Sequence, residues 1–240
     1  MNVLIFDISA DFGHFRKIFS TSSPLTYSIV TPTSFYGIIG AIVGLEKEEN
    51  KYLQYINHET TKVAIQLINS VKKMRLGLNH INTKGNIWIP KHRRKGGART
   101  QIRTEFLRFP RFRCYVHLYN EELFQQLIDY VKEHKNVYTV SMGLSECLAN
   151  IEFVSLETYE NRTEKEAVEI VTAIPESLLQ TLKIEAGKEY LKERLPIEMN
   201  SERIVSRYDE VLFEANGQPL TASVSSYWTN KQGKNIVFLN

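Results

Sequence analysis

The residues with the clearest chemistry form a basic stretch near the middle of the chain. Between Lys91 and Arg113 there are nine Lys or Arg residues and one acidic residue, Glu105, so the stretch has a formal charge of +8 and the rest of the chain −5. A local excess of one charge on an acidic body predicts contact with a polyanion, although a solvated run of charge is the simpler alternative. The candidate contacts here are Lys91, His92, Arg93, Arg94, Lys95, Arg99, Arg103 and Arg108.

A second cluster of suitable residue types lies in a polar segment near the N-terminus. Phe12 and Phe15 stand just before the pair Arg16-Lys17. Single-stranded nucleic acid offers base faces to aromatic rings and phosphates to cations, so this segment predicts a contact with RNA. The alternative is a surface basic pair beside two core phenylalanines.

Hydroxyl side chains stand before the longest apolar run of the chain. Thr33 or Ser34 can cap a helix that begins there. A helix N-terminus is also a suitable site for phosphate, because its first backbone N–H groups are free to donate. Capping alone needs only one of these hydroxyls, so both interpretations stay open.

Catalysis requires more than these clusters supply. Metal-independent RNA cleavage needs a base, an acid and a cation, which Lys91-His92 with Tyr36, or His14 with Lys17, could provide. Six histidines in 240 residues make such pairs common by chance. The sequence has no paired carboxylates, phosphate-binding glycine loop or thiol–histidine signature, and its two cysteines lack metal-ligand spacing. We therefore expect no catalytic residue, metal or cofactor.

Composition indicates a globular protein that does not enter a membrane. The 240 residues are 42% hydrophobic and 11% aromatic, enough for one sizeable domain, with or without a small appendage. The start of the chain is acidic by Asp7 and lacks the basic region of a signal peptide. The longest apolar run, Phe35 to Leu45, is too short for a transmembrane helix, which needs about 20 residues. These features predict a cytoplasmic protein.

Hydrophobic periodicity predicts alternating strands and helices up to residue 156. We expect strands at 3–8, 61–69, 111–119 and 151–156, helices at 33–45, 48–56 and from 120 onward, and an aperiodic basic insertion at 72–108 that also holds Trp88. This order is typical of an α+β, ferredoxin-like (RRM-like) split βαβ domain. The insertion would be a thumb hairpin in a domain of residues 1–156, followed by a small β-rich unit at 157–240 with strands near 167–174, 204–208, 211–213 and 236–239.

The strand at 111–119 has two contrasting faces. Arg113, Tyr115, His117 and Tyr119 alternate with apolar residues and would point away from the helices. In RNA-recognition modules such a face stacks bases. The second β-unit or a partner could instead cover it.

Four stretches resemble the Cas-five family of CRISPR-associated proteins, closest to its type I-B branch. They are residues 11–17 with 21–27, residues 32–45, residues 99–108, and residues 138–149 with the sequence Tyr-Thr-Val-Ser-Met-Gly-Leu-Ser-Glu-Cys-Leu-Ala. The resemblance covers roughly residues 1–155. It implies a ferredoxin-like domain with a thumb, and a subunit of Cascade that grips the 5′ handle of the guide RNA (crRNA). The RNA-binding positions that it implies are Phe12, His14, Phe15, Arg16, Lys17, Thr21, Thr33, Ser34, Ser141 and Gly143, together with the basic stretch.

The resemblance also sets out partners and alternatives. It implies contacts with the backbone and large subunits of Cascade, allows contact with target DNA within the complex, and implies none with a membrane. In most branches a separate enzyme cuts the precursor RNA. In the I-C branch, however, the Cas-five protein of that branch is itself the metal-independent endoribonuclease. We therefore predict a non-catalytic RNA-binding subunit, with a guide-processing endoribonuclease and an assembly scaffold without RNA contact as the two alternatives.

Overall fold

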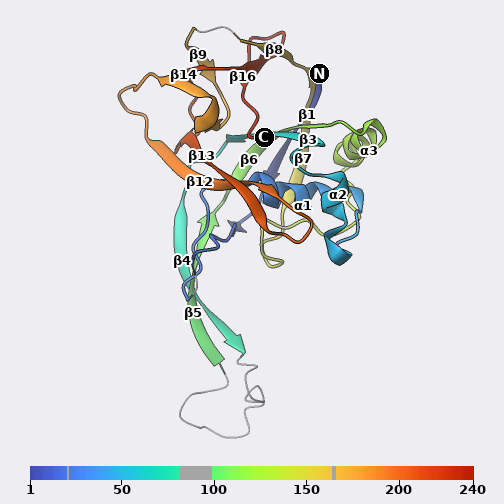
Figure 1. The fold of residues 1–240 in the computed structure, drawn as a ribbon. Helices are drawn as coiled ribbons and strands as arrows, with labels where there is room; N and C mark the ends of the chain where they lie inside the picture. The colour runs from blue at the N-terminus through green and yellow to red at the C-terminus, as the bar shows by residue number, and fades with distance from the viewer. Residues whose placement is uncertain (21, 82–98, 164–165) are drawn as a thin grey trace, which may run out of the picture.

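The centre of the protein is a four-stranded antiparallel sheet in the order β3-β6-β1-β7 (Figure 1). The computed structural model describes residues 1–20, 22–81, 99–163 and 166–240. Successive side chains of a strand point to opposite faces, so Leu4, Phe6 and Ile8 pack in one core cluster and Val3 and Ile5 in another. The four strands are β1 (Asn2–Ser9), β3 (Thr61–Leu67), β6 (Arg111–Leu118) and β7 (Asn150–Thr158), each within a few residues of its predicted range.

Two helices cover one face of this sheet. They are α1 (Pro32–Val43) and α3 (Glu121–Lys132), and η1 (Glu48–Asn50) and α2 (Tyr52–Tyr55) follow α1. The side chain of Asn120 accepts from the N–H of Leu123, as the predicted cap requires. The cap of α1 is Thr31, whose hydroxyl accepts from the N–H of Ser34, so the predicted cap at Thr33 or Ser34 was wrong. Gly44, in the left-handed conformation, ends α1.

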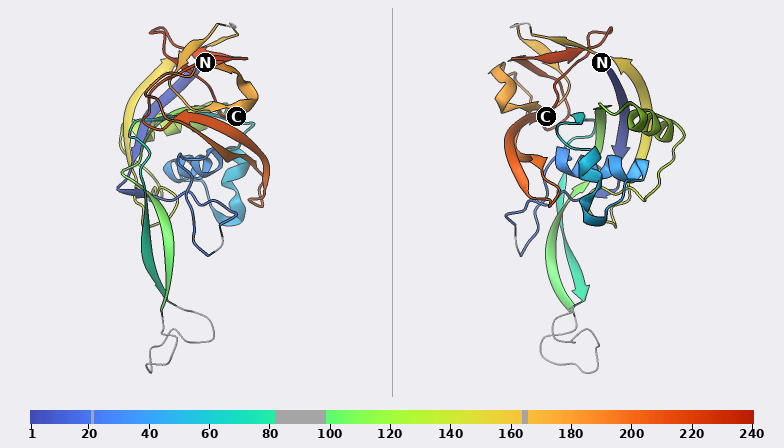
Figure 2. Two further views of the ribbon diagram at one scale, coloured as in Figure 1. Left: turned by 90° about the vertical axis from the view of Figure 1, so that its left-hand side faces the viewer. Right: turned by 45° about the vertical axis from the view of Figure 1, so that its right-hand side comes forward.

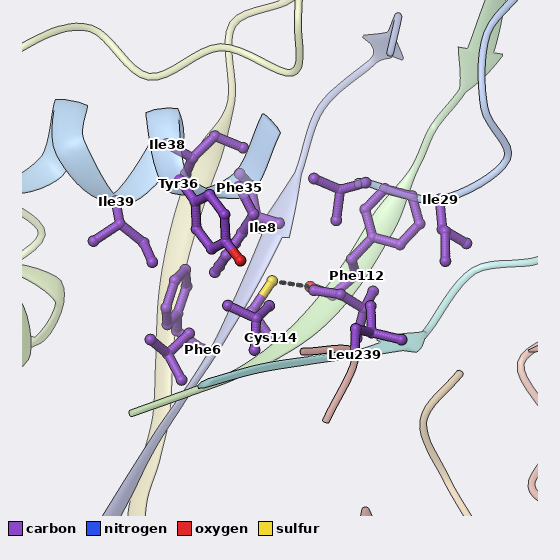
Figure 3. Packing of buried hydrophobic residues seen from close by; sticks show 14 of the residues in the cluster. Phe6, Ile8, Ile29, Phe35, Tyr36, Ile38, Ile39, Phe112, Cys114 and Leu239 are labelled. Carbon is purple, nitrogen blue, oxygen red and sulfur yellow. Dashed lines mark hydrogen bonds between the residues drawn. The ribbon is translucent and has the colours of Figure 1, made fainter. Parts of the chain in front are cut away.

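The main core lies between the sheet and the helices (Figure 3). Phe6 of β1 stacks on Phe35 of α1, with ring centroids 5.9 Å apart. Leu239, near the end of the chain, packs in the same core beside the sheet. The core therefore depends on residues from both ends of the sequence.

The opposite face of the sheet is not open for base stacking at its centre. Tyr115 is fully buried beneath Tyr159, Ile236 and Phe238. Arg113 donates to the buried carboxylate of Asp7. Base stacking is therefore excluded at Tyr115, because the C-terminal part of the chain covers it, as the alternative prediction for this face had it, and Arg113 is held by Asp7.

The segment at 72–108 contains two long paired strands. β4 (Lys73–Ile81) pairs with β5 (Arg99–Arg108), from Lys73 opposite Leu107 to Ile81 opposite Arg99, and β2 (Phe12–Gly13) pairs with the base of β5. The β4–β5 hairpin projects from the body (Figure 1). Trp88, Lys91, His92, Arg93, Arg94 and Lys95 lie outside the described residues.

The remainder of the chain is rich in strands, as the sequence predicts. It forms a three-stranded sheet in the order β10-β13-β12 and a six-stranded sheet in the order β11-β14-β9-β16-β15-β8. Leu195, Ile197 and Phe213 join the main core, so the packing continues across residue 156. The elements are β8 (Glu160–Arg162), β9 (Val168–Ile170), β10 (Ile174–Pro175), η3 (Glu176–Leu178), β11 (Leu179–Leu182), β12 (Tyr190–Met199), β13 (Val205–Glu214), β14 (Leu220–Val224), β15 (Tyr227–Thr229) and β16 (Asn235–Ile236).

Two features of this region differ from the sequence prediction. The ranges 204–208 and 211–213 form one continuous strand, β13, and its long partner β12 was not predicted. The mixed α+β class is confirmed. Among the described residues, no helix is long and apolar enough to cross a membrane.

Candidate nucleic-acid interface

The β4–β5 hairpin has one cationic face and one mainly apolar face. Because paired residues share a face, the register gathers Lys73, Arg75, Arg99 and Arg103 with the single acid Glu105. The other face carries Met74, Leu76, Leu78 and Phe106. Arg99 and Arg103 are exposed, as is Arg108 at the base, where its guanidinium lies 5.1 Å from the centre of the Phe109 ring. These arginines are free to meet phosphates.

The segment after β1 is held tightly against the base of this hairpin. His14 is buried, and its Nδ1 donates to the carbonyl oxygen of Glu105 at 2.6 Å. Phe15 is 2% exposed and packs against Phe112. Phe12 is half-buried, with its ring edge against Phe106. Of the three predicted ring side chains, His14 and Phe15 are buried and present no open face, whereas Phe12 is only half-buried.

The two predicted cations of this segment have different surroundings. Arg16 is exposed, and its guanidinium donates to the carbonyl oxygen of Ser20 at 3.2 Å. Lys17 lies over the Tyr27 ring and forms an ion pair with Glu193 at 3.0 Å. Arg16 is therefore available to a ligand, whereas Lys17 fastens the segment. Thr21 lies outside the described residues.

Glu193 of β12 is the centre of a charged network that the sequence analysis missed. Its carboxylate accepts from Lys17 at 3.0 Å, Lys73 at 3.4 Å, and the N–H and hydroxyl of Ser28 at 2.8 Å each. Burial by itself would raise the pKa of Glu193, but the Ser28 N–H and the two ammonium groups outweigh it and hold that pKa below its ordinary value. The network ties the N-terminal segment, the hairpin and β12 together.

A groove of about 740 Å³ runs beside α1. Ser34 from the start of the helix lines it together with Ser141 and Gly143, which come from a loop more than 100 residues later. Thr33 also borders the groove, but its side chain is buried and bonds to Thr31. Small side chains at Gly37 and Ala41 leave the flank of α1 open. The structure thus brings four predicted residues to one place.

Gly143 joins this groove to the N-terminal segment. Its φ is +92°, and a Cβ there would overlap the carbonyl oxygen of His14. The adjacent carbonyl of Met142 accepts from the N–H of His14 at 2.9 Å. Only glycine permits so close an approach. The groove, the N-terminal segment and the base of the hairpin therefore adjoin, although they are distant in sequence.

The residues considered for RNA cleavage do not assemble among the described parts of the chain. The Tyr36 hydroxyl is buried, which raises its pKa, and accepts from Asn240 at 3.2 Å. His14 is enclosed, and Lys91 and His92 lie outside the described residues. Burial also raises the pKa of both cysteines. Within the described ranges, no group of three His, Cys, Asp or Glu side chains could hold a metal ion.

Comparison with solved structures shows which class of protein this fold resembles, and comparison of the sequence with family profiles then shows the family. The structure is similar to a crystal structure of a CRISPR protein from Archaeoglobus fulgidus, with a TM-score of 0.57 and 14% identity over 98% of this chain and 97% of that one. It is also similar to a chain of a "CRISPR RNA-guided surveillance complex", with a TM-score of 0.52 and 11% identity over 93% and 91% of the two chains. No curated protein matches the sequence.

The sequence profile described as "CRISPR-associated protein (Cas_Cas5)" matches residues 3–215. The chain therefore belongs to the Cas5 family of CRISPR-associated proteins, and the predicted family is confirmed. Its assignment to the type I-B branch stays a prediction.

Proposed function

We propose that this protein is a non-catalytic subunit of a CRISPR effector complex, and that it binds and caps the 5′ handle of the crRNA. The observation that carries the proposal is the joined surface of hairpin, N-terminal segment and α1 groove. It brings together seven of the predicted RNA-binding positions from three distant parts of the chain, with Thr33 buried at its edge: Arg16, Ser34, Arg99, Arg103, Arg108, Ser141 and Gly143. Membership of the Cas5 family and the similarity to a chain of an RNA-guided complex support it.

The arrangement of the central sheet and its helices also supports a ferredoxin-like fold for this domain. The order β3-β6-β1-β7, with α1 and α3 on one face, agrees with the split βαβ arrangement of ferredoxin-like domains. We assign the complex to the Cascade type in the cytoplasm, with the backbone and large subunits as partners. In that role the protein would hold the 5′ end of the crRNA, while the neighbouring subunits bind the rest of the guide RNA.

The chemistry of the surface suits a single strand whose phosphates and backbone are held at several points. Arg99, Arg103 and Arg108 supply fixed charge along the hairpin and its base. At the other end, Ser34 and the first turn of α1 offer a hydroxyl and a partial positive charge. Contacts of this kind position an RNA without reading its sequence.

The salt dependence of RNA binding tests this proposal. Each lost phosphate contact on a single strand lowers the slope of log K against log salt by about 0.7, so replacing Arg99, Arg103 and Arg108 with Ala should lower it by about 2. The matched control is Arg162→Ala, because Arg162 is an exposed arginine paired with Glu160 in the C-terminal region. Equal slopes for the triple variant and the wild type would refute the role of the hairpin.

The scaffold alternative predicts a different result. In that case the isolated chain would not crosslink to handle RNA, and the cationic face would dock on an acidic protein. Photocrosslinking of the purified wild type to handle RNA and to a scrambled strand of equal length separates the two. Failure to crosslink either strand would overturn the proposal.

A further inference from the structure

A tight turn beside the hairpin exposes two adjacent large apolar side chains. Ile18 and Phe19 are 65% and 70% exposed, although the residues on both sides of them are anchored. Burial of such side chains normally stabilises a fold, so two neighbours left in water on a fixed turn indicate a surface made for contact.

The turn is rigid at its base. The carbonyl oxygen of Lys17 accepts from the N–H and the hydroxyl of Ser20, at 3.0 and 2.6 Å. The Ser20 hydroxyl in turn accepts from the N–H of Leu25 at 3.1 Å, and the N–H of Lys17 donates to the Leu25 carbonyl at 2.8 Å. Ile18 and Phe19 occupy the two central positions of this closed turn. Their backbone is therefore held in place before any ligand arrives.

The turn stands next to cations of the proposed RNA surface. The segment that follows it runs along β5, where the N–H of Glu105 donates to the carbonyl of Pro24 at 2.9 Å. In both views of Figure 2 the dark blue loop and the β4–β5 hairpin extend towards the same end of the molecule. Arg16 is exposed on the near side of the turn, and Arg75 on the hairpin.

Among the described residues, the acids of this region pair with other cations and leave Arg16 without an acidic partner. Glu193 is occupied by Lys17 and Lys73, and Glu105 lies within 3.4 Å of Arg75. An aromatic ring beside an exposed arginine fits a nucleobase with its attached phosphate better than an apolar protein pocket, since such a pocket gives the arginine no counter-charge.

We propose that Phe19 is the aromatic platform on which this protein stacks a base of single-stranded RNA, with Ile18 closing one side of the contact. The inference rests on the proposed function and deepens it by naming the stacking residue. Phe15, which the sequence suggested for this role, is buried in the core, and Phe12 has its ring edge against Phe106. Phe19 is far more exposed than Phe15 and, unlike half-buried Phe12, has no ring packed against it in the described residues.

The test uses the full chain and an oligoadenylate of about 12 nucleotides, within the usual site size of single-strand binders. One adenine at a time is replaced by 2-aminopurine, whose fluorescence falls on stacking. Phe19→Ala should weaken binding about 5- to 150-fold and abolish the quenching at one position. The salt slope should not change, because no charge is removed.

Matched variants separate stacking from general apolar contact. Phe19→Tyr should keep wild-type affinity and quenching, whereas Phe19→Leu should lose the quenching. Ile184→Ala is the control, because Ile184 is equally exposed, at 70%, but lies in the C-terminal region. Circular dichroism and urea unfolding should be unchanged in all four variants, since each side chain is exposed.

The failures are distinguishable. If the wild type does not bind the oligonucleotide at all, the proposed function fails and the stacking role with it. If the wild type binds with a steep salt slope but Phe19→Ala binds equally well, only the stacking role is wrong. If Phe19→Ala binds RNA normally but no longer co-purifies with the other subunits of its complex, the turn is a protein contact and the inference is overturned.

Discussion

Replacing Glu193 should loosen the N-terminal segment, because this one carboxylate holds it to the hairpin and to β12. Glu193→Gln removes the charge that faces Lys17 and Lys73 while keeping the size of the side chain. Breaking a fully buried ion pair costs about 3–5 kcal/mol, and a hydrogen bond to a charged group contributes about 1.5–3 kcal/mol. Lys17 and Lys73 keep side-chain exposures of 18% and 27%, so water can partly replace the carboxylate. We therefore expect a loss of about 2 kcal/mol in the free energy of unfolding.

Urea unfolding at pH 7 measures this loss, and Glu176→Gln is the matched control. Glu176 pairs with Lys192 at 2.8 Å, but the side chains are 54% and 48% exposed. A pair as exposed as this should contribute at most about 1 kcal/mol. If Glu193→Gln and Glu176→Gln destabilise equally, the network does not hold the segment and the reasoning is refuted.

The effect should depend on pH in a definite direction. The pKa of Glu193 is lowered in the folded protein, so its stabilisation is fully present above the ordinary Glu pKa of about 4.3. It is lost as the pH falls through the lowered value, where the carboxylate takes up a proton. The difference between the wild type and Glu193→Gln should therefore be largest near neutral pH and shrink below about pH 4. A difference that grows on acidification would contradict this account.

Two further predictions concern the glycine contact and cleavage. Gly143→Ala should destabilise the protein in urea unfolding by more than about 2 kcal/mol, because its Cβ would strike the carbonyl of His14. Gly187 has a similar φ of +83° but open space around it, so Gly187→Ala should cost only about 1 kcal/mol. The protein should not cut labelled repeat RNA in EDTA; a discrete product that disappears in His92→Ala or His14→Ala would instead favour the endoribonuclease.

Local patterns in the sequence were sufficient to predict the strands of the central sheet and the helix that begins after Asn120. Alternation along 111–118 and the cap at Asn120 depend on neighbours a few residues away, and both are present in the structure. The strand β12 was missed because its exposed charged residues interrupt the apolar pattern; its pairing with β13 and its packing on the main core support it instead. The exposed pair Ile18-Phe19, between Lys17 and Ser20 in a segment rich in serine, was a signal that could have been noticed.

The sequence by itself determined the family, the basic stretch and the residue types available for a single strand. Only the tertiary structure decided which of those residues reach solvent. Phe15 and His14 are buried in the core, and Lys17 forms an ion pair with Glu193, which lies 176 residues later in the chain. Ser34 and Ser141 line the same groove. The physical reason is that burial and ion pairing depend on contacts between distant segments, whereas residue type and spacing record only the local preferences of the chain.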